Sequence, residues 1–208
     1  NPTFFGHTLN GILYYADLPE KLNSPTLNGL NIELWRTNGS SNYMAYEINR
    51  GQQQLPQNNF VNMPSQPRNF FKLQNKIYFI ATNEGKENLY SLNEDFTFNN
   101  GTSNNQWNEG DNWAGQIVPF ESDDALIPAG KTPEINGNAS VKNISVSSPL
   151  NLSAGTLNVS GNLDLGAKIT LNGNNLNLKG PSSRITNGNA SNYIVTNGTG
   201  TVNVENLN

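Results

Sequence analysis

Short apolar pairs recur along the C-terminal half of the chain at a spacing that fits neither a helix nor a series of hairpins. In "SAGTLNVSGNLDLGAKITLNG", residues 153–173, apolar and polar residues alternate within each pair. Both apolar side chains of a pair therefore point to the same face of a short strand. The pairs begin 6, 7, 6, 6 and 7 residues apart, and they are Ile144/Val146, Leu150/Leu152, Leu157/Val159, Leu163/Leu165, Ile169/Leu171 and Leu176/Leu178.

The pattern repeats after 19 residues. The separation is the same from Ile144 to Leu163, from Leu150 to Ile169 and from Leu157 to Leu176. Three short strands in each 19-residue turn predict a parallel β-solenoid with a roughly triangular cross-section.

Equivalent strands of a solenoid stack about 4.8 Å apart, so the register also predicts which outward side chains are neighbours. These are Asn143 with Asn162, Asn158 with Asn177, and Asn151 with Thr170.

The pattern extends to about four turns, with an earlier turn at Ala125/Ile127, Ile135 and Ala139/Val141 and a later turn at Ile185, Tyr193/Val195 and Val202/Val204. Because an open solenoid end is an unpaired edge, we expect it to be capped.

Residues 1–98 lack this spacing and contain a weak internal duplication instead. "LNGILYYA" at 9–16 matches "LQNKIYFI" at 73–80, and "IELWRTNG" at 32–39 matches "ENLYSLNE" at 87–94. We therefore predict an all-β chain in three parts: a repeat domain over 1–98, a linker and tryptophan cap over 99–119, and the solenoid over 120–208.

Composition excludes several functions. Asn makes up nearly one residue in five and charged residues only 13% of the 208 residues, which favours a turn-rich β-protein. A net charge of -4 without a basic cluster argues against a nucleic-acid partner. No apolar stretch approaches the roughly 20 residues of a transmembrane helix. The absence of Cys excludes disulfides and zinc–thiolate sites.

Little in the sequence points to catalysis. His7 is the one histidine, and no nucleophile elbow, zinc-protease motif or P-loop occurs. Parallel β-helices of polysaccharide lyases need a groove lined by basic and acidic groups. The basic residues of this solenoid are scattered over different faces, at Lys131, Lys142, Lys168, Lys179 and Arg184. We expect no enzymatic activity.

Three tryptophans and three aspartates are the candidate binding residues. Trp107 and Trp113 are placed to cap the first solenoid turn; alternatively they form a sugar platform, and Trp35 is a third candidate for glycan stacking. Asp111, Asp123 and Asp124 are candidate calcium ligands, although no EF-hand or Gly-rich nonapeptide pattern accompanies them. Their alternative role is to form turns by hydrogen bonding to nearby backbone. No other cofactor is expected.

"NIELWRTNGSSNYMAYEINRG" and the flanking repeat sequences over residues 8–93 resemble the E-L-W-x-x-D-G-T repeats of large exported proteins of Bacteroidota. Glu33, Leu34, Trp35 and Gly39 match, Asn38 and Ser40 replace the usual Asp and Thr, and the second copy keeps Leu89 and an aromatic Tyr90. The resemblance implies propeller-type blades. Because two blades cannot close a ring, it also implies that these two belong to a larger propeller.

"QWNEGDNWAGQIVPFESDDALIPAGKTPEINGNASVKNISV" is similar to the segment that leads into solenoid regions of Bacteroidota surface proteins. The matching residues are Trp107, Asn112, Trp113, Pro119, Asp123, Asp124, Ile127, Pro128 and Gly130. This similarity implies export through the type IX secretion system and display at the cell surface.

Two functions from different classes remain open at this stage. The first is a non-catalytic structural or adhesive segment of a secreted or cell-surface protein, whose partners are other surface or secretion-machinery proteins or glycans. The second is a carbohydrate-binding module or part of a carbohydrate-active enzyme. Smooth ladders of Asn, Ser and Thr on the solenoid surface would favour the first, and a groove of carboxylates and basic groups would favour the second.

Overall fold

The computed structural model describes residues 6–17, 32–40, 42–46, 48–49, 51–54, 60–74 and 76–205. These residues form strands, turns and loops with a short 3-10 turn, η2 (Gly110–Asn112), so the chain is nearly all-β as predicted. The chain divides into two compact units, Asn1–Asn93 and Glu94–Asn208. No helix in the described part is long and apolar enough to cross a membrane.

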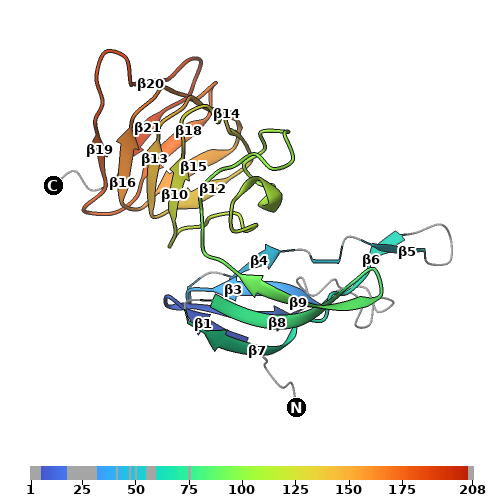
Figure 1. Ribbon diagram of the computed structural model, residues 1–208. Helices are drawn as coiled ribbons and strands as arrows, with labels where there is room; N and C mark the ends of the chain where they lie inside the picture. Colours follow the sequence, from blue (N-terminus) through green and yellow to red (C-terminus); the bar gives the residue numbers. More distant parts are fainter. Residues whose placement is uncertain are drawn as a thin grey trace. The chain divides into compact units, whose positions relative to one another are not determined.

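The second unit is a parallel β-solenoid with three four-stranded sheets (Figure 1). The chain visits the sheets in rotation, and each sheet gains one strand per turn. The first sheet contains β10 (Asp124–Ile127), β13 (Asn143–Val146), β16 (Asn162–Leu165) and β19 (Arg184–Thr186). The second contains β11 (Glu134–Asn136), β14 (Leu150–Ala154), β17 (Ile169–Thr170) and β20 (Ile194–Val195). The third contains β12 (Ala139–Val141), β15 (Thr156–Val159), β18 (Asn175–Leu178) and β21 (Val202–Val204).

The 19-residue register is confirmed on all three sheets. The strand pairs align Ile144 with Leu163, Leu150 with Ile169, and Leu157 with Leu176. All twelve residues of the six apolar pairs are buried, and none is more than 2% exposed. The earlier turn is also confirmed, since Ala125, Ile135 and Ala139 pair with Ile144, Leu152 and Leu157. The apolar core of this unit is therefore a continuous column inside the three sheets.

The last turn departs from the prediction at one strand. Ile194 pairs with the buried Ile169, and Val195 pairs with the outward Thr170. The predicted inward pair Tyr193/Val195 is therefore wrong by one residue, and Tyr193 is 46% exposed. The insertions before this strand lengthen the step between equivalent residues from 19 to 25 positions, so the periodicity no longer fixes its register. A one-residue slip reverses which side chains face inward.

The solenoid begins earlier than predicted. The backbone N–H of Phe98 donates to the carbonyl of Leu126 in β10 at 2.9 Å, and Thr97 pairs with Leu126 in parallel. Residues 94–98 thus add to the edge of the first sheet, and the boundary lies after Asn93 rather than after residue 98.

The first unit contains two antiparallel sheets that fit blade-like repeats. One has the order β1 (Gly6–Leu9), β2 (Ile12–Asp17), β3 (Glu33–Thr37), β4 (Asn42–Tyr46); the other has the order β7 (Arg68–Leu73), β8 (Lys76–Asn83), β9 (Lys86–Leu92). A two-stranded ribbon, β5 (Gln52–Gln54) and β6 (Phe60–Asn62), lies between them in the sequence.

The internal duplication is visible in the strand registers of this unit. Leu9 and Leu73 each end the first strand of a hairpin with a two-residue turn. Tyr15 then lies opposite Trp35, and its equivalent Phe79 lies opposite Tyr90. The two copies therefore place matching residues at matching positions, as the sequence comparison predicts.

Truncating one residue of the inward column tests its contribution to stability. Leu157→Ala should lower the free energy of unfolding by about 2–5 kcal/mol, because a fully buried Leu loses its contacts and leaves a cavity. Lys142→Ala is the matched control: its side chain is exposed on the same solenoid, so the change should stay within about 0.5 kcal/mol. Chemical denaturation followed by circular dichroism measures both, and equal small effects would contradict the buried column.

Candidate functional site

The two tryptophans before the first solenoid turn form its cap. Trp107 and Trp113 are each 0% exposed, their ring centroids lie 4.7 Å apart, and the rings meet edge to face. The indole N–H of Trp113 donates to the carbonyl of Trp107 at 2.8 Å. The backbone N–H of Trp107 donates to the carbonyl of Glu134 in β11 at 2.9 Å, which ties the cap to the edge of the second sheet.

Asn112 holds the loop that carries these rings. It is 0% exposed, and its side-chain Oδ1 accepts hydrogen bonds from the backbone N–H (2.9 Å) and hydroxyl (2.7 Å) of Thr102. Its Nδ2 donates to Oδ1 of Asn104 and to the carbonyl of Gln106. A buried amide whose donor and acceptor are both used fixes a loop firmly. The Asn-Trp pair of the sequence is thus a structural unit.

The burial of both rings decides between the two roles expected for them. A cap requires covered rings, whereas a sugar platform requires an exposed indole face. Neither Trp107 nor Trp113 has such a face, so the predicted cap is formed and the alternative sugar platform is not. Residues 99–119 are also not a linker, because they pair with the solenoid and belong to its unit.

The three candidate calcium ligands do not gather into a site. Oδ2 of Asp123 accepts a hydrogen bond from the backbone N–H of Phe120 at 2.9 Å, which closes a turn. Oδ1 of Asp124 accepts one from Nδ2 of Asn143 at 2.7 Å. Asp111 lies in the 3-10 turn η2. Among the described residues, no three Asp, Glu, His or Cys side chains are close enough to hold a metal ion. These aspartates therefore do not form a carboxylate cluster, and the hydrogen bond of Asp123 fits the alternative, turn-forming role.

The Glu of the E-L-W motif is a buried hydrogen-bond acceptor. Glu33 is 0% exposed, and its Oε2 accepts from the backbone N–H of Ile48 (3.1 Å) and the hydroxyl of Ser65 (2.7 Å). Its Oε1 accepts from the backbone N–H of Ser65 at 3.1 Å. The carboxylate thus fastens two connecting segments to β3. Satisfied burial of this kind gives Glu33 a structural role.

The turn after β3 is closed by the side chain of Asn38. Its Oδ1 accepts from the backbone N–H of Ser40 at 2.9 Å, an Asx turn that Asp and Asn form equally well. Gly39 has a φ of +92°, which favours glycine.

Trp35 is the tryptophan that keeps some exposed surface. It lies in β3 opposite Tyr15 and Met44, and it is half-buried. Its Nε1 is buried without a hydrogen-bond partner among the described residues. Of the three candidate glycan-stacking residues, only Trp35 is not fully buried.

Comparisons with protein-family models, with curated proteins and with solved structures give no match for this chain.

Hydrogen-bonded columns of polar side chains run along the outside of the solenoid. On the third sheet, Nδ2 of Asn158 donates to Oγ of Ser140 (3.3 Å), Asn177 donates to Asn158 (2.9 Å), and Asn203 donates to Asn177 (2.8 Å). The predicted Asn158–Asn177 neighbours are thus confirmed, and so are Asn151 with Thr170. On the first sheet a second column connects Asp124, Asn143, Asn162 and Arg184, in which Oδ1 of Asn143 accepts from the backbone N–H of Asn162.

The outer face of the β7–β8–β9 sheet is a surface that sequence reasoning missed. Phe71 stacks on Tyr78 with centroids 5.4 Å apart, and Leu73 and Leu89 are 58% and 64% exposed. The sequence pattern could have predicted this surface. "NFFKL" and "KIYFIAT" carry apolar residues at successive positions, which is typical of a strand with apolar side chains on both faces.

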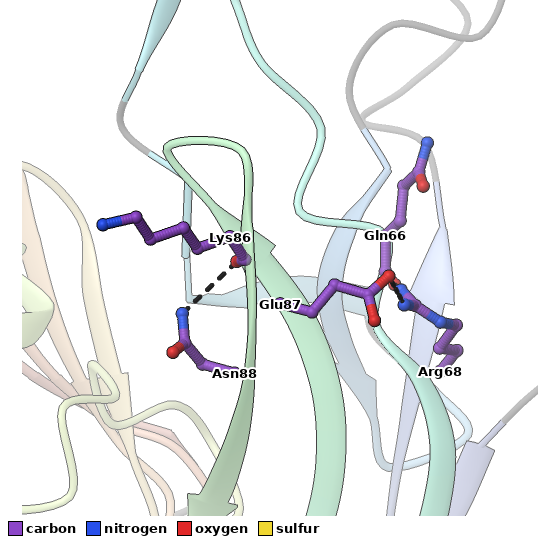
Figure 2. A network of polar contacts seen from close by, with 5 residues as sticks. All are labelled: Gln66, Arg68, Lys86, Glu87 and Asn88. Atoms are coloured by element: carbon purple, nitrogen blue, oxygen red, sulfur yellow. Dashed lines mark hydrogen bonds and ion pairs between the residues drawn. The ribbon is translucent and has the colours of Figure 1, made fainter.

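An ion pair crosses the same face at the other end of the sheet. Figure 2 shows the carboxylate of Glu87 in β9 extending toward β7, where it meets the guanidinium of Arg68. Arg68 also donates to the carbonyl of Gln66 at 3.3 Å. The two charges offset each other, so this face combines an apolar area with a neutralised polar end.

Two substitutions of one ring separate the packing of the cap from its hydrogen bond. Trp113→Ala should lower the free energy of unfolding by about 3–5 kcal/mol, because a fully buried aromatic side chain is removed. Trp113→Phe keeps a ring and loses the indole N–H donor, so its cost should be clearly smaller. Thermal and denaturant unfolding measure both variants. A Trp113→Ala variant as stable as the parent chain would contradict the capping role.

Proposed function

We propose that this chain is a non-catalytic structural or adhesive segment of a bacterial secreted or cell-surface protein. The observation that carries the proposal is the set of outward polar columns on the solenoid. Their side chains hydrogen bond to one another along the stack, as in Ser140–Asn158–Asn177–Asn203, rather than converging on a common point. A surface of mutually bonded amides is rigid and regular, which suits a spacer or a binding face.

The resemblances in sequence support a location outside the cell or at its surface. The E-L-W motif with its Asn-Gly turn, and the Asn112–Trp113 pair with its cap, both correspond to features of exported Bacteroidota proteins. We propose export through the type IX secretion system, with other surface or secretion-machinery proteins as partners. Glycans are a further class of partner for the polar solenoid faces.

A carbohydrate-binding module is the second candidate, and it now depends on Trp35. This residue is half-buried, whereas the other two tryptophans have no exposed face. Saturable polysaccharide binding that Trp35→Ala abolishes and Trp35→Phe retains would favour this candidate over the structural one.

Surface display can be tested with the lysines of the solenoid. Lys142, Lys168 and Lys179 are exposed in the structure. A membrane-impermeant amine reagent applied to intact producing cells should therefore label them, as detected by mass spectrometry of tryptic peptides. Labelling that appears only after the cells are lysed would contradict display at the cell surface. A cytoplasmic protein followed in the same samples controls for leakage.

A further inference from the structure

The last turn of the solenoid differs in spacing from the turns beneath it. Its strands β19, β20 and β21 have only three, two and three residues. The step to the equivalent residue in this turn is longer than the regular 19 positions on every sheet. It is 22 from Leu163 to Ile185, 25 from Ile169 to Ile194, and 26 from Leu176 to Val202. The last turn therefore carries inserted residues between its strands.

Two of the inserted loops lie against inward leucines of the turn beneath. A Cβ atom added at Gly188 would lie 3.8 Å from Cδ1 of Leu165, and one added at Gly200 would lie 3.2 Å from Cβ of Leu171. Leu165 and Leu171 are 2% and 0% exposed. Loop backbone thus covers these two leucines, at places where the lower turns use apolar side chains.

The inward apolar pattern also stops at these two places. Asn187 follows β19 and Thr196 follows β20, at the positions that Leu165 and Leu171 occupy in the turn beneath. Both residues are polar and exposed. The last turn therefore offers a further layer fewer inward apolar side chains than the turns beneath it offer.

Hydrogen bonds hold the first loop in place. Oδ1 of Asn189 accepts from the backbone N–H of Ser191 at 2.8 Å and of Asn192 at 3.1 Å, so the loop satisfies part of its own backbone. Nδ2 of Asn187 donates to Oδ1 of Asp164 in β16, which ties the start of the loop to the layer beneath.

A pair of amides holds the second loop. Nδ2 of Asn197 donates to Oδ1 of Asn172 at 2.9 Å, and Oδ1 of Asn197 accepts from the backbone N–H of Asn172 at 2.7 Å. The loop that contains Gly200 is thus fastened to the third turn from the side of Asn197.

Charged residues flank the apolar side chains that remain partly exposed in the last turn. Ile185 and Val204 are each 38% exposed. Arg184 precedes the first and Glu205 follows the second, and both charged residues are exposed. Short edge strands with charged side chains are a known protection of a sheet edge against pairing with another strand.

We propose that the last turn is a stop for the stack: its loops close the apolar column, so that neither a further 19-residue layer nor the end of a second copy stacks on it. Terminal repeats of solenoids commonly act as caps that keep the inner repeats soluble. The first turn is closed by tryptophans and the last by loop backbone, which fixes the length of the solenoid and directs contacts with partners to its sides. The inference is independent of the proposed location and partners.

Two glycine variants of the whole chain test whether the loop is seated on the column. A Cβ atom at Gly200 would lie 2.6 Å from the carbonyl oxygen of Asn174, whereas the nearest atoms to one at Gly188 are 3.8 Å away. Gly200→Ala should therefore lower the Tm by about 2–4 °C or more, and the control Gly188→Ala should leave it nearly unchanged. A Gly200→Ala variant that melts like the parent chain would overturn the proposal.

Shortening the first loop tests the stop itself. A full chain without residues 189–191 and with Asn187→Leu restores the regular spacing before β20 and an inward Leu. In sedimentation velocity this chain should self-associate at least about tenfold more strongly than the parent, since an uncovered solenoid end is an unpaired edge. Adding Val204→Glu, which places a charge on that end, should reverse the gain.

Two results of this experiment would contradict the stop. One is a shortened chain that keeps the circular dichroism spectrum of the parent and sediments like it. The other is a parent chain whose own self-association is weakened by Val204→Glu, because its solenoid end would then already bind a second copy. If the shortened chain does not fold, the two glycine variants decide the proposal.

Discussion

A strand with apolar side chains needs a neighbour over its face and a partner along its edge, and this chain meets that need by stacking repeats. In the solenoid each turn places residues such as Leu157 and Leu176 directly above one another, so that one column of apolar side chains serves all turns. No single turn encloses a core, because its apolar side chains are covered only when the next layer is present. In the blade-like repeats, apolar side chains are likewise covered by a neighbouring element, but the contact is between sheet faces and not between solenoid layers.

The first and last turns of the solenoid differ in how far their apolar side chains are covered. At the start, residues 94–113 pair with the edges of β10 and β11 and place Trp107 and Trp113 over the column. In the last turn, Ile185 and Val204 occupy positions above the inward residues Leu163 and Leu178, yet each is 38% exposed. The first turn is therefore covered by large aromatic side chains, whereas these two residues of the last described turn are partly exposed.

The high Asn content has a structural explanation in the same stacking. An Asn amide carries both donor and acceptor, so identical residues in register can bond to one another along a column, as Asn158 and Asn177 do at 2.9 Å. Other Asn side chains bond to backbone in turns, as in the Asx turn of Asn38. Asp124 and Asp164 show that carboxylates enter the columns as acceptors, each receiving a hydrogen bond from the layer next to it.

Sequence predicted the parts of the fold that depend on regular spacing. The registers of Leu150 with Ile169 and of Ala125 with Ile144 follow from the period alone. Prediction was wrong at Tyr193, because an insertion there changes the spacing and leaves several registers with comparable apolar patterns.

The candidate sites were harder to predict because they depend on burial. Residue type does not reveal whether Trp107 is covered by its own loop, or whether Asp123 turns its carboxylate toward the backbone of Phe120. The exposed outer face of the β7–β8–β9 sheet was missed for the same reason, because the exposure of Leu89 depends on how sheets pack and not on the local sequence pattern.

The most direct test of the stacking register is a disulfide cross-link, which the absence of native Cys makes free of background. Asn158 and Asn177 lie in adjacent layers, so their Cα atoms are about 4.8 Å apart, within the range a disulfide can bridge. The paired substitutions Asn158→Cys and Asn177→Cys should cross-link under mild oxidation. Ser140→Cys with Asn177→Cys spans two layers, about 10 Å, and should not. Cross-linking of the second pair, or its absence in a folded chain carrying the first, would contradict the 19-residue stack.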